Sequence, residues 1–107
     1  MSIIGDVKDK IALMIDDIVD TAGSLCEGAK ALKKLGAKSV LAACIHPVLS
    51  KNAVDRINDS VIEKLIVTDT IPLRKESDKI IVLSMAQSIG DVVLRIQAQR
   101  SVSLLFR

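Results

Sequence analysis

Three carboxylates and two hydroxyls stand close together near the start of the chain, in an order that suits a sugar phosphate. Asp16 and Asp17 follow directly after an apolar run, and Asp20 comes three residues later. Thr21 and Ser24 lie on either side of two small residues, just before a segment of helical periodicity. Carboxylates accept hydrogen bonds from sugar hydroxyls, while a turn at a helix N-terminus binds phosphate through its backbone N–H groups.

The small residues Ala22 and Gly23 favour this interpretation, because short side chains let backbone N–H groups approach a phosphate closely. Gly23 can also adopt a positive φ angle. The acidic residues repel one another, and ribose hydroxyls or Mg²⁺ would relieve that repulsion. Since successive strand residues point to opposite faces, we expect one of Asp16 and Asp17 to face the ligand and the other to support the backbone. A structural alternative stays open, in which the charges stabilise a helix N-terminus and Asp20 or Thr21 caps it.

Short apolar runs alternate with segments of helical periodicity along the rest of the chain. The apolar runs predict buried strands at residues 10–15, 39–45, 64–68 and 80–84. The periodic segments predict helices at residues 23–35, 50–58 and 84–98, and the polar stretch 72–79 predicts a surface loop. This alternation indicates one α/β domain over residues 1–107, with a parallel, Rossmann-like sheet of about four to five strands flanked by helices.

Two details of these predicted helices concern their ends and their buried side. Ser50 and Ser84 stand where helices are expected to begin, and each is a candidate N-cap. Apolar residues recur every three or four positions in the last helix, which predicts a buried stripe made of Ile89, Val92, Val93 and Ile96.

The composition argues against several classes of protein. The net charge of +2 is too small to indicate binding to nucleic acid or to an anionic membrane. No apolar run approaches the roughly 20 residues of a membrane span, and no signal-peptide pattern is present, so we expect a cytoplasmic protein. Cys26 and Cys44 lie far apart, and with a single histidine they cannot form a zinc site. We expect both cysteines to be free thiols.

The stretch from Asp16 to Leu25 resembles the phosphoribosyl-pyrophosphate (PRPP) binding motif of the type I phosphoribosyltransferase fold. Three further segments, 42–50, 67–72 and 101–106, resemble in this order one family of that group, ribose-phosphate pyrophosphokinase (PRPP synthetase). The motif alone would fit many phosphoribosyltransferases, whereas the combination is more specific. The resemblance covers nearly the whole chain but only the C-terminal half of a typical family member, so we expect the N-terminal domain to be absent here.

Enzymes of this family transfer the pyrophosphoryl group of ATP to ribose 5-phosphate, which gives PRPP and AMP for nucleotide biosynthesis. The resemblance implies that Asp16 and Asp17 face the 2- and 3-hydroxyls of the ribose. It also implies that the 5-phosphate is bound by the turn formed by Asp20, Thr21, Ala22, Gly23 and Ser24. The family usually carries threonine at the last of these positions, and the serine here keeps the hydroxyl while losing a methyl group.

The resemblance locates most of the catalytic machinery outside this chain. The ATP pocket, the basic catalytic loop and the principal Mg²⁺ ligands belong to the preceding part of the family's enzymes. We therefore expect no catalytic residue here and no firm metal ligand, with Asp16 and Asp17 meeting Mg²⁺ only through a bound ligand. The chain alone is expected to bind ribose 5-phosphate or PRPP without catalysis.

Two further segments have roles implied by the resemblance. Ser101, Val102 and Ser103 match a segment that in many family members helps bind a regulatory phosphate or ADP between subunits; the alternative is a C-terminal strand or cap. His46 falls in a family segment at the end of a strand, either as a structural hydrogen-bonding residue or close to the active site. The family also implies homo-oligomers, dimers built into hexamers.

Three other functions remain to be distinguished. A signalling receiver domain also places an acidic pair after its first strand, and Asp69 could be its phosphate acceptor. It would need a late lysine, however, and none follows Lys79. A nucleobase phosphoribosyltransferase shares the PRPP motif but not the other segments. A non-catalytic regulatory homologue of PRPP synthetase would tend to have an altered ribose-phosphate motif.

Overall fold

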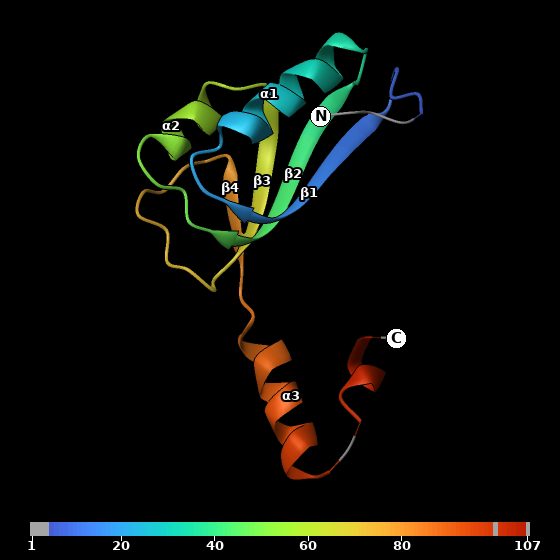
Figure 1. Cartoon of the computed structure of the whole chain (residues 1–107), viewed down its shortest axis with the longest axis vertical. Helices are drawn as coiled ribbons and strands as arrows, with labels where there is room; N and C mark the ends of the chain where they lie inside the picture. The colour runs from blue at the N-terminus through green and yellow to red at the C-terminus, as the bar shows by residue number, and fades with distance from the viewer. Residues whose placement is uncertain (1–4, 100, 107) are drawn as a thin grey trace.

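The chain forms an α/β fold around a sheet of four parallel strands, in a computed structural model that describes residues 5–99 and 101–106. The strands lie side by side in chain order: β1 Ile11–Val19, β2 Ser39–Pro47, β3 Ile62–Thr68 and β4 Ile80–Leu83. The helical elements are α1 Gly23–Lys34, α2 Ala53–Asn58, α3 Ala86–Gln97 and the 3₁₀ turn Ser103–Phe106. This arrangement confirms the predicted parallel α/β class (Figure 1).

The hydrophobic core lies between one face of the sheet and the first two helices. Helix α1 packs against β1, β2 and α2, as short right-handed crossovers between neighbouring parallel strands require. Side chains from the central strands and α2 are fully buried there, and the largest are Ile57, Ile62, Leu65, Val40 and Val67. These aliphatic residues make the platform from which the strand ends project.

The opposite face of β1 is open, so the prediction of a buried first strand is wrong. Its residues alternate in exposure, with Leu13 at 54% and Ile15 at 77%. On the same side of the sheet, Ile45 and Leu83 are also exposed. An apolar run predicts that both faces of a strand are buried, but it does not show which segment covers the second face.

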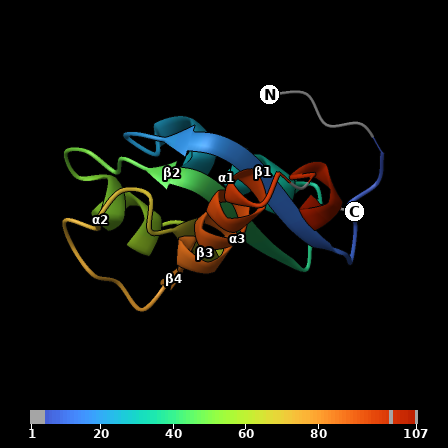
Figure 2. The same cartoon turned by 90° about the horizontal axis from the view of Figure 1, so that it is seen from below.

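Helix α3 extends beyond the carboxyl ends of the strands, away from the sheet (Figure 1). Seen from below, it stands between the viewer and the strand ends (Figure 2). The predicted buried stripe is therefore wrong: no residue of α3 is buried, Val92 is half-buried, and Ile89, Val93 and Ile96 are exposed. Its amphipathic pattern is real, but the surface that would cover it is not part of the described residues.

Several element boundaries differ from the sequence prediction, and three of them concern the end of β1 and the starts of α2 and α3. Strand β1 does not end at residue 15, because its pairing with β2 continues through Asp16 to Val19. Helix α2 begins at Ala53, so Ser50 is not its N-cap. The N-cap position of α3 is Met85, although the Ser84 hydroxyl accepts a hydrogen bond from the next-but-one backbone N–H at 3.1 Å.

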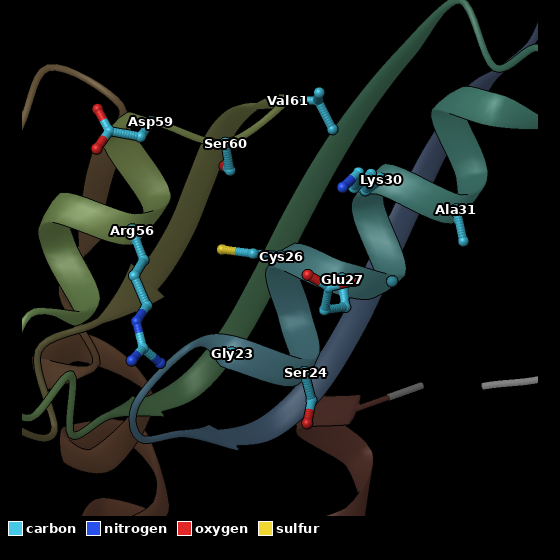
Figure 3. A pocket seen from close by; sticks show the side chains of 11 residues that line it. Gly23, Ser24, Cys26, Glu27, Lys30, Ala31, Arg56, Asp59, Ser60 and Val61 are labelled. Atoms are coloured by element: carbon cyan, nitrogen blue, oxygen red, sulfur yellow. The ribbon is translucent and has the colours of Figure 1, made fainter.

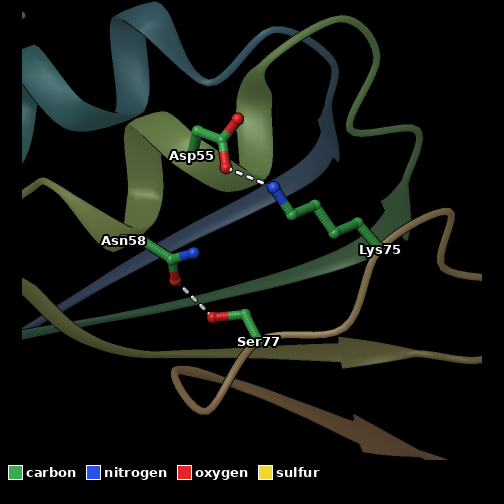
Figure 4. Close-up of polar contacts among 4 residues, drawn as sticks. All are labelled: Asp55, Asn58, Lys75 and Ser77. Carbon is green, nitrogen blue, oxygen red and sulfur yellow. Dashed lines mark hydrogen bonds and ion pairs between the residues drawn. The ribbon is translucent and has the colours of Figure 1, made fainter.

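Residues 72–79 form the predicted surface loop, and this loop is bonded to α2 (Figure 4). Lys75 forms an ion pair with Asp55 at 2.6 Å, and the Ser77 hydroxyl donates to the side-chain oxygen of Asn58. Lys79 donates to the carbonyl of Ile57 at 3.3 Å. The exposed ion pair is worth about 1 kcal/mol at most, so it adds little to the stability of the fold.

Candidate functional site

The turn between β1 and α1 is built around a left-handed residue, Ala22. It has φ 66° and ψ 8°, is 4% exposed, and stands at the N-cap position of α1. Its carbonyl accepts the Cys26 N–H at 3.0 Å, which closes the first helical turn. The positive φ thought suitable for Gly23 falls on Ala22 instead. No side chain caps α1 among the described residues, so the capping role considered for Asp20 or Thr21 is wrong.

The structure gathers most of the predicted ligand residues around one small hollow. This hollow has a volume of about 250 Å³, slightly below the range of about 300–1,000 Å³ that is usual for ligand pockets. It is lined by Asp16, Ile18, Val19, Asp20, Thr21, Ala22, Gly23, Ser24 and Leu25. Asp17 is the one residue of the predicted set that does not line it, as the alternation of strand residues requires.

Each of the two adjacent carboxylates accepts a hydrogen bond from the backbone N–H of the residue that follows it. Asp16 accepts the N–H of Asp17 at 2.8 Å, and Asp17 accepts the N–H of Ile18 at 2.8 Å. The side-chain hydrogen bond with Asp16, followed by the bond from the Ile18 N–H, lowers the pKa of Asp17 below its ordinary value. Asp17 is therefore ionised at neutral pH and presents an acceptor at the strand end.

The loop after β2 braces this turn from the side. The backbone N–H groups of Leu49 and Ser50 donate to the carbonyls of Val19 and Asp20 at 3.1 and 2.9 Å. The Ser50 hydroxyl also donates to the Asp20 carboxylate. Sequence reasoning assigned Ser50 to a helix cap, and only the adjacency of the β1 and β2 ends in the folded sheet reveals its contact with Asp20.

The start of α1 is well suited to an anion. The first N–H groups of any helix lack intrahelical partners, and they carry the positive end of its dipole. The first turn of α1 contains no acidic residue, and Ser24 lines the adjacent hollow. Thr21 lines the same hollow one residue before the N-cap. The start of α1 and two hydroxyl-bearing residues therefore lie around one hollow, an arrangement typical of anion sites at helix N-termini.

His46 lies at the same edge of the sheet, paired in register with Ile18 of β1. Its Nδ1 is 2.9 Å from the hydroxyl of Thr70, which in turn donates to the carbonyl of Ile45 at 3.0 Å. The hydroxyl of Thr68 donates to the same carbonyl at 2.5 Å. These bonds give His46 a structural role in joining the ends of β2 and β3, while leaving it beside the candidate site.

The C-terminal serines are not brought to this hollow. The C-terminal segment follows α3, away from the sheet (Figure 1). The hydroxyls of Ser101 and Ser103 lie 2.9 Å apart at the start of its 3₁₀ turn. Val102, between them, is half-buried. The guanidinium of Arg95 donates to the Ser101 carbonyl at 3.3 Å, which brings one basic side chain to this segment. A 3₁₀ turn replaces the strand considered as the structural alternative.

Both cysteines are free thiols, as predicted. Burial raises the pKa of Cys44 to about 11, and burial likewise raises the pKa of Cys26. Within the described residues no group of three or more His, Cys, Asp or Glu side chains could hold a metal ion. Likewise, none of the described helices combines the length and apolar character of a membrane span.

A second, larger hollow of about 970 Å³ lies between α1 and the end of α2 (Figure 3). Gly23 and Ser24 belong to both hollows, whereas Arg56 lines only the larger one. The start of α1 therefore separates the two. The other residues around the larger hollow are Cys26, Glu27, Gly28, Lys30, Ala31, Asp59, Ser60 and Val61.

Comparison with known proteins gives consistent matches. The family described as "Phosphoribosyl synthetase-associated domain" matches residues 1–107. Ribose-phosphate pyrophosphokinase of Campylobacter jejuni is 50% identical over 106 residues, which cover 99% of this chain and 34% of that protein. Ribose-phosphate pyrophosphokinase 1 of Streptococcus agalactiae is 51% identical over 108 residues, which cover 99% of this chain and 34% of that protein.

A solved structure agrees with these sequence matches. The crystal structure of phosphoribosylpyrophosphate synthetase from Mycobacterium smegmatis superimposes with a TM-score of 0.85 at 32% sequence identity. The superposition covers 90% of this chain and 33% of that chain. The chain thus spans about a third of the length of the curated relatives it matches.

Proposed function

Because the chain belongs to the phosphoribosyl synthetase-associated domain family, we propose that it is the C-terminal part of a ribose-phosphate pyrophosphokinase. The whole enzyme transfers the pyrophosphoryl group of ATP to ribose 5-phosphate and releases PRPP and AMP, for nucleotide biosynthesis. In this proposal residues 1–107 contribute the binding site for ribose 5-phosphate or PRPP. The observation that carries the proposal is the small hollow at the start of α1, where acidic side chains meet a helix N-terminus.

The 5-phosphate is proposed to bind over the turn that contains Ala22. The left-handed conformation of Ala22 changes the direction of the chain immediately before α1, so that successive N–H groups face one region. The hydroxyls of Thr21 and Ser24 add donors, and the small side chains at positions 22 and 23 leave room for the anion. A phosphate there interacts favourably with the positive end of α1.

The ribose hydroxyls are proposed to bind the carboxylates at the end of β1. Asp16 lines the hollow directly, and Asp17 is held ionised beside it. Asp20 carries a third negative charge, which the Ser50 hydroxyl partly satisfies. Each hydroxyl that donates to a carboxylate forms a charge-assisted bond, stronger than one between neutral groups.

Phosphoryl-transfer chemistry depends on positioning and on neutralising phosphate charge with Mg²⁺ and basic side chains. Asp16 and Asp17 would meet the ion only through the bound sugar phosphate. The ATP site, the catalytic residues and the principal Mg²⁺ ligands are proposed to lie in the rest of the enzyme. The chain alone is accordingly proposed to bind its ligand without turnover.

Further proposals concern assembly, location and regulation. The exposed apolar side chains on the open face of the sheet and on α3 support association with further copies of the protein, as a homo-oligomer in the cytoplasm. Ser101, Val102 and Ser103 are proposed to contribute to a regulatory phosphate site between subunits. The contact of Arg95 with the Ser101 carbonyl supports that role by bringing a cation to the segment.

The test is the affinity of the chain for ribose 5-phosphate, measured by NMR titration of the backbone amides. Gly23→Val places a branched side chain at the start of α1 and should weaken binding by about tenfold or more. Gly90→Val is the matched control, because a Cβ on Gly90 meets nothing within 4 Å. An equal loss of affinity for ribose 5-phosphate in both variants would refute the proposed site. The absence of saturable binding by the unmodified chain would refute it as well.

A second ligand separates recognition of the sugar from recognition of the phosphate. 2-Deoxyribose 5-phosphate lacks one hydroxyl and should bind at least about tenfold more weakly, because it loses one charge-assisted hydrogen bond. Asp16→Asn together with Asp17→Asn should remove most of that difference while leaving affinity for inorganic phosphate unchanged or higher. If both sugars bind the unmodified chain equally well, the carboxylates do not contact the hydroxyls.

A further inference from the structure

Arg56, on α2, reaches the back of the turn between β1 and α1. Its Nη1 donates to the carbonyl oxygen of Thr21 at 3.3 Å. The same Nη1 would lie only 3.3 Å from a Cβ added to Gly23. In Figure 3 the guanidinium lies beside the start of α1, on the side of the larger hollow. Arg56 thus contacts the candidate phosphate loop although it is 35 positions away from Thr21 in the sequence.

The contact of Arg56 with the Thr21 carbonyl also determines the direction of the Ala22 N–H. The peptide bonds of the described residues are trans, and in a planar trans peptide the C=O and the N–H point in opposite directions. Arg56 holds the Thr21 oxygen toward the larger hollow, so the N–H of Ala22 is directed to the other side. That side is the smaller hollow, which Ala22 and Asp16 line and Arg56 does not.

The backbone at this position needs external support. A left-handed conformation is unfavourable for alanine, and Ala22 has no side-chain cap to stabilise it. A guanidinium bonded to the preceding carbonyl favours this orientation of the peptide over its alternatives. A side chain at position 23 would crowd this guanidinium, because its Cβ would lie 3.3 Å from Nη1. The absence of a side chain at Gly23 therefore leaves room for Arg56 as well as for an anion.

Arg56 projects from a helix whose own position is well determined. Ala53 and Ile57 of the same helix are completely buried in the core. The loop at residues 72–79 bonds to the flanking residues Asp55 and Asn58 (Figure 4). The burial of Ala53 and Ile57 holds α2 against the core, so Arg56 reaches the turn from a helix with a defined position.

The charge of Arg56 is available to an anion. The single ion pair among the described residues joins Lys75 to Asp55, so the guanidinium of Arg56 has no carboxylate partner there. A guanidinium has five N–H donors, and the contact with Thr21 uses one of them. A positive charge just behind the turn raises the affinity of the turn for a phosphate in front of it.

We propose that Arg56 is a positioning residue for the phosphate-binding turn: it orients the peptide between Thr21 and Ala22 so that its N–H faces the anion, and it supports the anion's charge from behind. This inference rests on the proposed function and adds a residue that lies outside the motif itself. Arg56 does not touch the sugar phosphate, because it lines the hollow on the opposite side of the turn.

The test compares three variants of the full chain with ribose 5-phosphate as the ligand. Arg56→Gln should weaken binding about tenfold, and Arg56→Lys, which keeps the charge but loses the planar fork, about threefold. Arg74→Gln is the matched control, since it removes the same side chain from an exposed position of the loop at 72–79. It should change affinity by less than about twofold.

A measurement without ligand separates positioning from general stability. In the free protein, Arg56→Gln should shift the Thr21 carbonyl carbon and change the coupling constant that reports φ of Ala22, and Arg74→Gln should change neither. A lower melting temperature with unchanged affinity and unchanged Ala22 coupling would overturn the proposal. If the unmodified chain itself does not bind ribose 5-phosphate, the proposed function fails first. In that case the ligand-free NMR shifts alone decide whether Arg56 orients the peptide between Thr21 and Ala22.

Discussion

Two leucines on opposite faces of the sheet should differ sharply in their contribution to stability. Leu65 is 0% exposed at the centre of the core, whereas Leu13 is 54% exposed on the open face. Leu65→Ala removes fully buried methyl groups and leaves a cavity, which costs about 3–4 kcal/mol. Full burial of a leucine is worth about 1.5–3 kcal/mol, so Leu13→Ala, with half of that burial to lose, should cost about 1 kcal/mol.

The assay is urea unfolding of both variants in dilute protein, followed by circular dichroism. With a denaturant slope of about 2 kcal/mol per molar urea, the midpoint should fall by about 1.5–2 M for Leu65→Ala and about 0.5 M for Leu13→Ala. Similar costs for the two variants in dilute protein would refute the one-sided core. They would mean that part of the chain covers the face on which Leu13 lies.

Protein concentration extends the same prediction to the proposed self-association. If copies associate through the open face, an increase in concentration stabilises the folded state by mass action. A concentration about 100 times the dissociation constant would add about 2.7 kcal/mol. Leu13→Glu should abolish this gain, because it places a charge in the interface, and should leave the dilute protein folded. A midpoint independent of concentration would argue against association through this face.

Three further predictions follow from single residues. Gly90→Ala should stabilise α3 by about 1 kcal/mol, seen as increased helical circular dichroism, because its Cβ meets nothing within 4 Å; a loss of helix would contradict this. At pH 8 a thiol reagent should modify half-buried Cys26 well before buried Cys44, whose pKa is raised to about 11; labelling in the reverse order would contradict the burial. The hydrogen bond from the backbone N–H of Met85 lowers the pKa of Asp69. The stability that this bond contributes should be present above about pH 4 and be lost as the pH falls through the lowered pKa. Carboxyl NMR should find the pKa of Asp69 below its ordinary value, and an ordinary value would contradict the bond.

The parallel architecture and the site-bearing turn were predictable because both depend on local patterns. Apolar runs alternating with helical periodicity are sufficient to predict βα units, and sheet geometry then places ligands at the carboxyl ends of strands. The end of β1 was less predictable. Charged residues usually end an apolar strand, but pairing with β2 continues the ladder through Asp16 as far as Val19.

Contacts between distant residues were not predictable from the sequence. Ser50 and Arg56 meet the turn at Asp20 and Thr21 across separations of 30 and 35 residues. Such contacts form only when the fold places β2 and α2 beside β1, and no local sequence pattern predicts them. The exposed position of α3 is a similar case, since an amphipathic stripe predicts that a helix is covered but does not identify the covering surface.

The most direct test of the proposed phosphate site is a map of backbone amide shifts with ribose 5-phosphate and, separately, with ribose. With the phosphorylated sugar we expect saturable shifts centred on residues 20–25, led by the amide of Ala22, and with ribose much smaller shifts. Equal responses to the two sugars, or shifts centred away from the start of α1, would contradict a phosphate site at this turn.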